Sequence, residues 1–328
     1  TARRASVRAM MNDSAPAQGA NNSDLARAAQ RDAYLHLLKR TLTRYPLEPS
    51  EQVMLLALHD MPPALTRPIA QWGMSSQLKM NGSNGFNPVL RTFGLDWPSD
   101  AETMIGLYRL DNIEQCVMSA LRRNVPGDFA EMGVWRGGAS IFMRALLKAS
   151  GDRERKVWLA DSFQGLPPPD ADNYPADLGD DLWTFPQLAI SLDTVKANFA
   201  RYGLLDEQVR FLPGWFRDTL PTAPIEKLAV LRLDADMYES TILALHSLYH
   251  KVSPGGFVIV DDYASVPACQ QAVDDFRAEQ DIVEPLCPID WTGVYWQTST
   301  LARNGTKKRR SANASRSSAK APRKGARR

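Results

Sequence analysis

The sequence predicts an α/β fold built on a mostly parallel, doubly wound, Rossmann-like sheet. Between residues 128 and 298, seven short apolar runs typical of buried strands occur, and most of them alternate with segments of helical periodicity. Strands separated by helices pair in parallel, because each crossover returns the chain to the same end of the sheet. The last two strands, near 282–287 and 293–298, are joined by a short connection, which predicts an antiparallel pair at one edge.

The expected elements follow in order along this region. Strands are predicted at DFAEMGV from 128, KVWLAD from 156, QVRFLPG from 208, LAVLRLD from 228 and GFVIVDD from 256. The segments between them that carry helical periodicity are 140–149, 191–202, 239–251 and 267–280. The loop at 165–181 is rich in proline and aspartate, which disfavours a regular element there.

Four segments precede the predicted sheet. We expect residues 1–23 to be mobile, and residues 24–44 to form a helix with an apolar stripe at Tyr34, Leu37, Leu38, Thr41 and Leu42. The stretch 59–100 is rich in proline, glycine and asparagine, which is typical of a lid or binding loop. Helical periodicity returns at 101–123. The predicted division is therefore a mobile N-terminus (1–23), a helical and lid segment (24–123), a catalytic domain (124–300) and a tail (303–328).

Composition limits the class of protein. The chain has 328 residues, of which 44% are hydrophobic and 23% are charged, as in globular proteins. No apolar run approaches the length needed to cross a bilayer. Cys116, Cys269 and Cys287 lie far apart, which argues against a disulfide framework or a zinc site and favours a reducing, cytoplasmic location.

The C-terminal tail carries an unusual charge. Residues 303–328 hold 11 Lys or Arg and no acidic residue, which leaves 28 basic against 37 acidic residues in the rest of the chain. With almost no large apolar side chains, this tail is expected to be disordered. Nucleic-acid or anionic-membrane binding is one interpretation. A solvated tail is favoured over it, because no aromatic residues alternate with the charges.

Four aspartates follow two neighbouring strands. Asp234 and Asp236 come after LAVLRL, and Asp261 and Asp262 come after GFVIV. The carboxyl ends of parallel strands meet at one edge of a sheet, where α/β proteins bind ligands. Crowded carboxylates repel one another unless a cation lies between them, and oxygen ligands suit a hard divalent metal ion. The competing interpretation is that these aspartates only cap the following helices.

A glycine-rich turn follows the first strand. The segment AEMGVWRGGAS contains Glu131, Gly133 and Gly137, but its spacing is not G-x-G-x-x-G and it lacks the lysine of a phosphate loop. Both departures argue against a dinucleotide or a nucleoside triphosphate. Glu131 could pair with an ammonium group, and Asp161, after the second strand, is placed to accept ribose hydroxyls. S-adenosylmethionine has a ribose, a cationic amino acid end and no phosphate.

Longer strings carry a resemblance to a known family. ETMIGLYRLDNIEQCV, PGDFAEMGVWRGGASIFMRA, LADSFQGLPPPD, VRFLPGWFRDTLP, LRLDADMYEST and PGGFVIVDDY resemble the macrocin O-methyltransferase family over roughly residues 32–298. The resemblance implies the Rossmann-like S-adenosylmethionine-dependent methyltransferase fold, with a seven-stranded sheet and an antiparallel last strand. It also implies an enzyme that uses S-adenosylmethionine and Mg²⁺ to methylate sugar hydroxyls of macrolides and related glycosides. One departure is Ala235, where the family pattern has glycine.

The resemblance also implies roles for individual residues. The metal ligands would be Asp234, Asp261 and Asp262, and the general base Asp236. The cofactor site would contain Glu131, Gly133, Gly137, Asp161 and Ser162, with the adenine near Gly214 and Trp215. For Asp236, a fourth metal ligand or a helix cap remains an alternative. The aromatic side chains Trp72, Phe86, Phe93 and Trp97 could stack on an acceptor or belong to the core.

Other functions remain open at this point. The expected partners are a small glycoside acceptor and other copies of the chain, since the stripe on helix 24–44 could pack against a second subunit. One alternative is an O-methyltransferase of the same fold acting on a phenol or a cell-surface saccharide. Catechol methyltransferases place a lysine near this point of the chain. The residues here are Met237, Tyr238 and Glu239, with no lysine, which favours an aliphatic hydroxyl over a phenol as the methyl acceptor. Another alternative is a non-catalytic binding protein that uses the basic tail.

Overall fold

The structure, a computed structural model, describes residues 22–45, 87–98 and 100–299. Its centre is a seven-stranded sheet with the order β3-β2-β1-β4-β5-β7-β6. The strands are β1 (Asp128–Met132), β2 (Val157–Asp161), β3 (Val209–Pro213), β4 (Leu228–Leu233), β5 (Val252–Val260), β6 (Cys287–Pro288) and β7 (Val294–Gln297). β1 to β5 are parallel, and β7 runs antiparallel to both β5 and β6. The predicted fold class is confirmed, although β6 is far shorter than the strand expected near 282–287.

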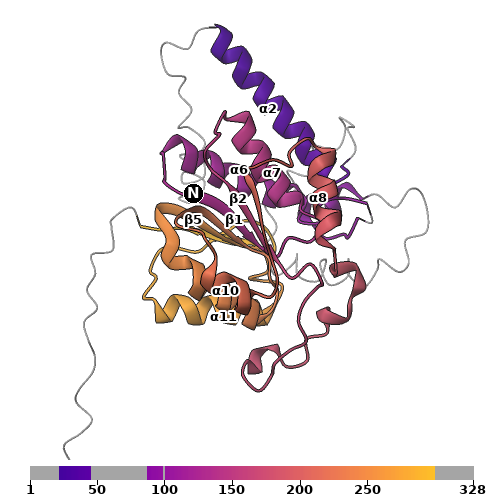
Figure 1. Cartoon of the computed structure of the whole chain (residues 1–328), viewed down its shortest axis with the longest axis vertical. Coiled ribbons are helices and arrows are strands. Elements are labelled where there is room, and N and C mark those ends of the chain that lie inside the picture. Colours follow the sequence, from indigo (N-terminus) through magenta and orange to yellow (C-terminus); the bar gives the residue numbers. More distant parts are fainter. Residues whose placement is uncertain (1–21, 46–86, 99, 300–328) are drawn as a thin grey trace, which may run out of the picture.

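Helices cover both faces of this sheet (Figure 1). On one face lie α6 (Gly106–Arg122), α7 (Gly138–Ala149) and α8 (Leu192–Arg201), and on the other lie α10 (Tyr238–Leu248) and α11 (Pro267–Glu279). Within the described residues, the remaining α-helices are α2 (Asn22–Leu42), the short α5 (Pro88–Phe93) and α9 (Phe216–Thr219). The helix predicted at 239–251 ends earlier, at Leu248, and a 3₁₀ turn completes it at Tyr249–Lys251.

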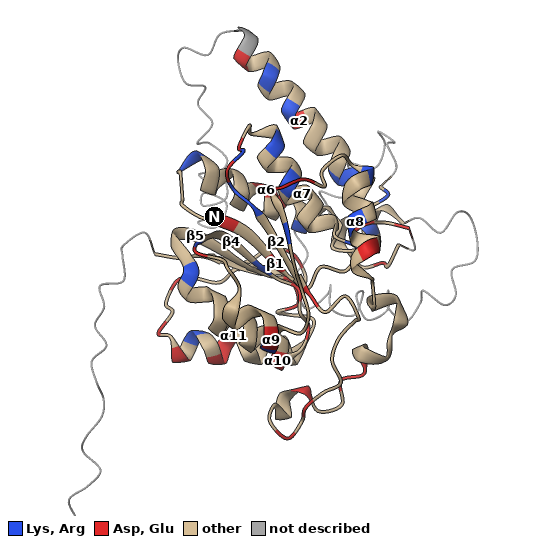
Figure 2. Ribbon diagram, in the orientation of Figure 1, with Lys and Arg blue, Asp and Glu red and all other residues tan. Residues whose placement is uncertain are grey.

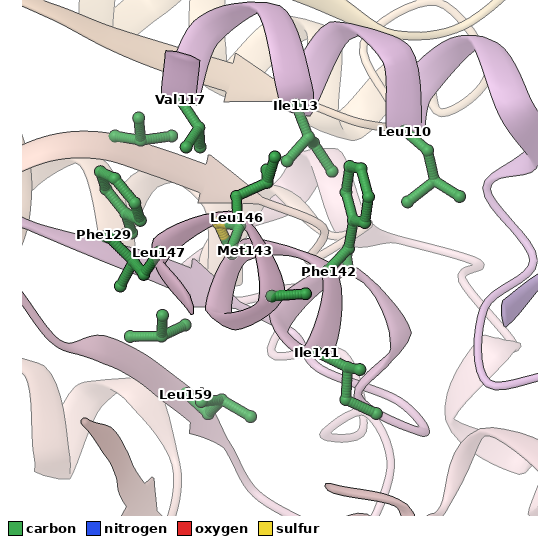
Figure 3. Packing of buried hydrophobic residues seen from close by; sticks show 14 of the residues in the cluster. Leu110, Ile113, Val117, Phe129, Ile141, Phe142, Met143, Leu146, Leu147 and Leu159 are labelled. Atoms are coloured by element: carbon green, nitrogen blue, oxygen red, sulfur yellow. The ribbon is translucent and has the colours of Figure 1, made fainter. Parts of the chain in front are cut away.

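The core on the α6–α7 face shows why these segments form helices. Leu110, Ile113 and Val117 recur at helical spacing on α6, and all three are fully buried. They face Phe142 and Leu146 of α7 (Figure 3), and α7 lies over β1 and β2 while α6 lies over β4 and β5. Burying a side chain of this size contributes about 1.5–3 kcal/mol relative to leaving it in water. This face therefore anchors the sheet that positions the site.

Helix α2 packs on the body along a stripe that only partly matches the predicted one: Leu38 and Leu42 are buried as predicted, and Thr41 is exposed. Leu35, Leu38 and Leu42 are buried against α6 and α7, whereas Tyr34 and Leu37 are 41% and 49% exposed. The buried side chains follow an i, i+3, i+7 spacing, so Leu35 takes the place that the prediction gave to Tyr34. Lys39 fixes the orientation by pairing with Asp111 of α6 at 2.6 Å.

Several predicted features lie outside the described residues: most of the mobile N-terminus, the larger part of the 59–100 segment with Trp72 and Phe86, and the basic tail. Within the described part of the chain, no helix is long and apolar enough to cross a membrane. The helix predicted at 101–123 begins only at Gly106, whose φ of +78° departs from helical backbone. Residues 101–105 instead pass over the glycine-rich turn after β1.

Candidate active site

A cavity of about 260 Å³ lies at the carboxyl ends of the parallel strands. It brings together most of the residues selected from the sequence. Those that line it are Glu131, Gly133, Asp161, Ser162, Trp215, Asp234, Asp236, Asp261 and Asp262. Gly137 and Gly214 do not line it, although both shape the loops that do. One cavity therefore holds the predicted cofactor residues and the predicted metal ligands side by side.

Gly133 makes the turn after β1 possible. Its φ is +83°, a region that other residues rarely adopt, and a Cβ there would lie 1.8 Å from the backbone oxygen of Asp234. Only glycine allows the β1 turn and the β4 tip to approach this closely. Gly137 has a φ of +90° at the start of α7, and a Cβ there would meet Val195 of α8 at 2.9 Å. Gly137 therefore serves helix packing next to the site.

Asp161 organises the loops around the cofactor end of the cavity. Its Oδ2 accepts a hydrogen bond from the Val134 amide and its Oδ1 one from the Phe163 amide, both at 2.7 Å. Burial raises the pKa of Asp161, while these backbone donors oppose the shift. The Gly214 amide donates to the Asp161 carbonyl at 2.9 Å, which brings Trp215 to the cavity wall. Each oxygen of the Asp161 carboxylate has a further lone pair for a ligand.

Ser162 and Trp97 also line the cavity. The Ser162 hydroxyl donates to the Gly165 carbonyl at 2.7 Å and accepts from the Gln164 amide at 2.9 Å, so it stabilises its own loop. Trp97 lines the cavity, and its ring meets Phe185 edge-on with centroids 6.3 Å apart. Phe93, by contrast, is buried against Tyr108 away from the cavity, as a core residue.

Three of the four aspartates form a compact cluster. One carboxylate oxygen from each of Asp234, Asp261 and Asp262 lies within 4.8 Å of the others. The sheet register causes this arrangement, because Leu233 pairs with Val260 and the Asp261 amide donates to the Leu233 carbonyl at 2.9 Å. The positions after these two strands therefore meet at the same level. This is the geometry expected for ligands to one cation.

Asp236 occupies a strained turn beside the cluster. Its φ is +53°, and the Met237 amide donates to the Ala235 carbonyl at 2.6 Å across it, as in a tight γ-turn. The turn directs Asp236 into the wall of the cavity. Burial there, together with the Asp234, Asp180 and Asp261 carboxylates, raises the pKa of Asp236 to about 8.

Two buried arginines, neither singled out in the sequence, balance part of this acidic charge. Arg232 is fully buried within β4; its Nη1 lies 2.5 Å from Glu131 Oε1 and 2.8 Å from Asp234 Oδ2, and its Nη2 pairs with Asp261. Arg109 reaches in from α6 to pair with Asp261 and, through Nε at 3.1 Å, with Asp290. The sequence could have indicated Arg232, because it is a charged residue inside the apolar run LAVLRL and a buried charge requires charged or polar partners.

Glu131 is more constrained than the sequence suggested. It is 1% exposed, pairs with Arg232 and accepts a hydrogen bond from the Ser140 hydroxyl of α7. Burial raises the pKa of Glu131 to about 7, although Arg232 opposes the shift. The carboxylate still lines the cavity, so it is available to a ligand only as a shared partner of Arg232.

The donor set fits a divalent cation. Within the described residues, Oδ2 of Asp262 is buried without a hydrogen-bond partner. Burial and the carboxylates of Asp236, Asp234 and Asp261 raise the pKa of Asp262 well above its usual value, and Arg109 opposes this shift only in part. A cation held by oxygens of Asp234, Asp261 and Asp262 would satisfy that orphaned atom and offset the excess charge.

The segment before α6 covers the glycine-rich turn. The carbonyl of Glu102 accepts from the Gly138 amide at 2.9 Å, and the guanidinium of Arg136 donates to the carbonyl of Ala101 at 3.0 Å. The Glu102 side chain, 2% exposed, is held by Arg44 at 2.8 Å and by the Tyr202 hydroxyl at 2.8 Å. These contacts tie the end of α2 and α8 to the cofactor side of the cavity.

A model of the macrocin O-methyltransferase family matches residues 31–298. The chain belongs to this family. Its members transfer methyl groups to oxygen, so the chain is an O-methyltransferase. The match covers the sheet, the flanking helices and every residue of the cavity described above.

Individual relatives agree with this assignment. The chain is 49% identical over 276 residues to the 8-demethyl-8-(2,3-dimethoxy-alpha-L-rhamnosyl)-tetracenomycin-C 4'-O-methyltransferase of Streptomyces olivaceus, covering 84% of this chain and 96% of that protein. It is 57% identical over 213 residues to the demethyldecarbamoylnovobiocin O-methyltransferase of Streptomyces niveus, covering 65% of this chain and 81% of that protein. Among solved structures, the O-methyltransferase NovP has a TM-score of 0.69 at 46% identity, covering 82% of this chain and 99% of that one.

Proposed function

We propose that this O-methyltransferase transfers the methyl group of S-adenosylmethionine to a sugar hydroxyl of a natural-product glycoside, with a divalent cation such as Mg²⁺ at Asp234, Asp261 and Asp262. The observation that carries the proposal is the convergence of those three carboxylates, within 4.8 Å, on the cavity that also holds Gly133 and Asp161. Relatives whose names give tetracenomycin rhamnoside and novobiocin acceptors support the class of acceptor.

The cofactor end of the cavity suits S-adenosylmethionine. The Asp161 carboxylate, which lines the cavity, would accept hydrogen bonds from the ribose hydroxyls. Gly133 allows the β1 turn to approach the β4 tip and so shapes this end of the cavity, and Trp215 offers an aromatic surface for the adenine. Glu131, held by Arg232, would attract the ammonium of the amino acid end. No glycine-rich phosphate cradle with a lysine is present in the turn, which matches a ligand without phosphate.

The acceptor end supplies the chemistry of methyl transfer. A sugar hydroxyl is a weak nucleophile at neutral pH, and a divalent cation bound at the aspartate cluster would polarise it and fix its orientation. A cation at the cluster would lower the pKa of Asp236, which is about 8 in the protein alone, and the resulting carboxylate would take the hydroxyl proton as the oxygen attacks the methyl carbon. The carbon–sulfur bond breaks with its electrons on sulfur, which leaves neutral S-adenosylhomocysteine. Alignment of oxygen, carbon and sulfur in one cavity provides much of the rate gain.

The test is a methylation assay with S-adenosylmethionine carrying a labelled methyl group. The acceptor panel contains glycosides with vicinal sugar hydroxyls and a simple catechol, each assayed with Mg²⁺ and with EDTA. We expect label in a glycoside, loss of turnover in EDTA and recovery with Mg²⁺. Asp236→Asn should lower kcat by about 10²–10⁴-fold with S-adenosylhomocysteine affinity unchanged. Faster methylation of the catechol than of any glycoside would overturn the acceptor class, and turnover that EDTA does not affect would overturn the cation.

A further inference from the structure

The segment 165–190, between β2 and α8, forms a wall of the cavity. It contains three 3₁₀ turns, Pro175–Asp177, Leu182–Thr184 and Pro186–Leu188. Leu182 and Leu188 of this segment line the cavity. The acidic residues of the segment are coloured red in Figure 2. Much of the segment is exposed, and Leu178 is 78% exposed, so little apolar burial holds it in place. Specific polar contacts must therefore fix its position.

Asp177 makes the strongest of these contacts. It is 1% exposed, next to the exposed Leu178. Its Oδ1 accepts from the Tyr238 amide at 2.6 Å, and its Oδ2 accepts from the Glu239 amide at 2.9 Å. Those are the first two amides of α10, whose own preceding residue, Met237, has no side chain able to cap a helix. Asp177 thus supplies, from 61 residues earlier in the chain, the cap that α10 lacks.

The capped helix begins directly after the strained Asp236 turn. Asp236 has a φ of +53°, and such a conformation persists only where the surrounding structure holds it. β4 holds the turn on one side, and the N-terminus of α10 holds it on the other. Asp177 fixes that N-terminus. The far end of the wall is fixed separately, where the indole nitrogen of Trp135 donates to the Gln187 carbonyl at 2.9 Å.

We propose that Asp177 is a positioning residue for methyl transfer, clamping the 165–190 segment to the start of α10 so that the Asp236 turn and the Leu182–Leu188 wall keep their places around the acceptor. The inference rests on the proposed function, because it gives Asp177 a role at the acceptor side of the same cavity. Asp177 is not among the residues that line the cavity. It acts through two backbone amides, so its loss should disturb acceptor turnover more than cofactor binding.

The test compares Asp177→Ala and Asp177→Asn with wild type and with Ser191→Ala as a matched control. Ser191 also caps a helix, accepting from the Thr194 amide at 3.2 Å at the start of α8, and does not line the cavity. Asp177→Asn keeps one carbonyl oxygen as an acceptor and guards against a failure of Asp177→Ala to fold. Three quantities are measured: amide hydrogen exchange, S-adenosylhomocysteine affinity, and kcat and KM for the glycoside.

For Asp177→Ala we expect faster exchange at Tyr238, Glu239 and residues 178–190, and a loss of about 10- to 100-fold in kcat/KM for the acceptor. The affinity for S-adenosylhomocysteine should stay within about twofold, and Asp177→Asn should be intermediate. Ser191→Ala should keep wild-type kcat/KM. Unchanged exchange and turnover in Asp177→Ala would overturn the clamp, as would an equal loss in Ser191→Ala.

Failure of the proposed function is distinguishable from failure of the clamp. Hydrogen exchange and S-adenosylhomocysteine binding need no acceptor. If wild type methylates no glycoside, the proposed function fails, and the exchange of residues 178–190 alone then decides the clamp: faster exchange in Asp177→Ala supports it and unchanged exchange overturns it.

Discussion

Nη1 of Arg232 lies 2.5 Å from Oε1 of Glu131, so a guanidinium inside β4 holds the carboxylate of the neighbouring strand β1. The same guanidinium also contacts Asp234 and Asp261. One buried cation therefore links the acid at the cofactor end of the cavity to two of the acids proposed as metal ligands. The acidic cluster is built around a fixed positive charge that the protein supplies itself.

Replacing Arg232 should destabilise the fold strongly. In Arg232→Met, the buried carboxylates of Glu131 and Asp261 lose their shared partner, as does the partly exposed carboxylate of Asp234. Breaking a buried ion pair in this way typically costs about 3–5 kcal/mol. Urea unfolding in EDTA measures the change. The control is Arg210→Met on β3, where the guanidinium donates to the Val209 carbonyl at 3.3 Å and lies outside the cluster. A loss under about 1 kcal/mol for Arg232→Met, or an equal loss in the control, would contradict this interpretation.

Replacing Asp262 should change stability and cation binding in opposite directions. Oδ2 of Asp262 is buried without a hydrogen-bond partner among the described residues, and neighbouring carboxylates repel its charge. Asp262→Asn removes that repulsion, so in EDTA its Tm should exceed the wild-type Tm by a few degrees. The variant should also lose the rise in Tm that Mg²⁺ gives wild type, because ligand binding stabilises the folded state. A lower Tm in EDTA, or an unchanged response to Mg²⁺, would count against the cluster as a cation site.

The pKa of Asp236 predicts how stability depends on pH in EDTA. Burial and Asp234 raise this pKa from its usual value of 3.8 to about 8. Between roughly pH 4 and pH 8 the folded protein keeps a proton that the unfolded chain has released, so the free energy of unfolding falls as pH rises through this window. Glu131, with a pKa raised to about 7, contributes a slope of the same sign.

Urea unfolding of Asp236→Asn across the same pH range isolates the contribution of Asp236. We expect a shallower fall in the free energy of unfolding than in wild type, with the remaining slope due to Glu131 and Asp262. Identical slopes in the two proteins would show that Asp236 has an ordinary pKa.

Glycine at 133 is required by the space around it as well as by its backbone. In Gly133→Ala the new Cβ would lie 1.8 Å from the Asp234 oxygen, so the β4 tip must move. Gly151→Ala is the matched control, since Gly151 has a similar φ of +72° but no atom within 4 Å of the new Cβ. The control should lose only about 1 kcal/mol from backbone strain. Gly133→Ala should lose more and should also bind S-adenosylhomocysteine at least about tenfold more weakly, measured by calorimetry. Equal effects of the two changes would refute the steric argument.

The sequence predicted the strand-tip residues well, and the reason is topological. Once LAVLRL and GFVIV are assigned as neighbouring parallel strands, the positions of Asp234 and Asp261 follow from the sheet alone. The same logic placed Asp161 at the tip of β2. These predictions needed only local periodicity and the rule that parallel strands end on one side.

Contacts between distant segments were not predictable in this way. Arg109 meets Asp261 across 152 residues, and Asp177 caps α10 across 61. Neither pairing produces a periodic pattern in the sequence, because each depends on how a helix or a loop docks on the sheet. The stripe on α2 was also wrong at Tyr34 and Leu37, since apolar residues on neighbouring faces compete and only docking selects the buried one.

Arg109 of α6 pairs with Asp261, which follows β5, and this contact limits where related chains can be recombined. A chimaera that joined this chain to a relative at residue 124 would take α6 from one parent and Asp261 and Asp290 from the other. Unless both parents share the arginine and its partners, that junction leaves the buried carboxylate of Asp290 without its arginine, while Asp261 keeps only Arg232. Useful crossover points are therefore those that inherit α6, the β5 tip and the turn at Asp290 as one unit, although these pieces are far apart in the gene.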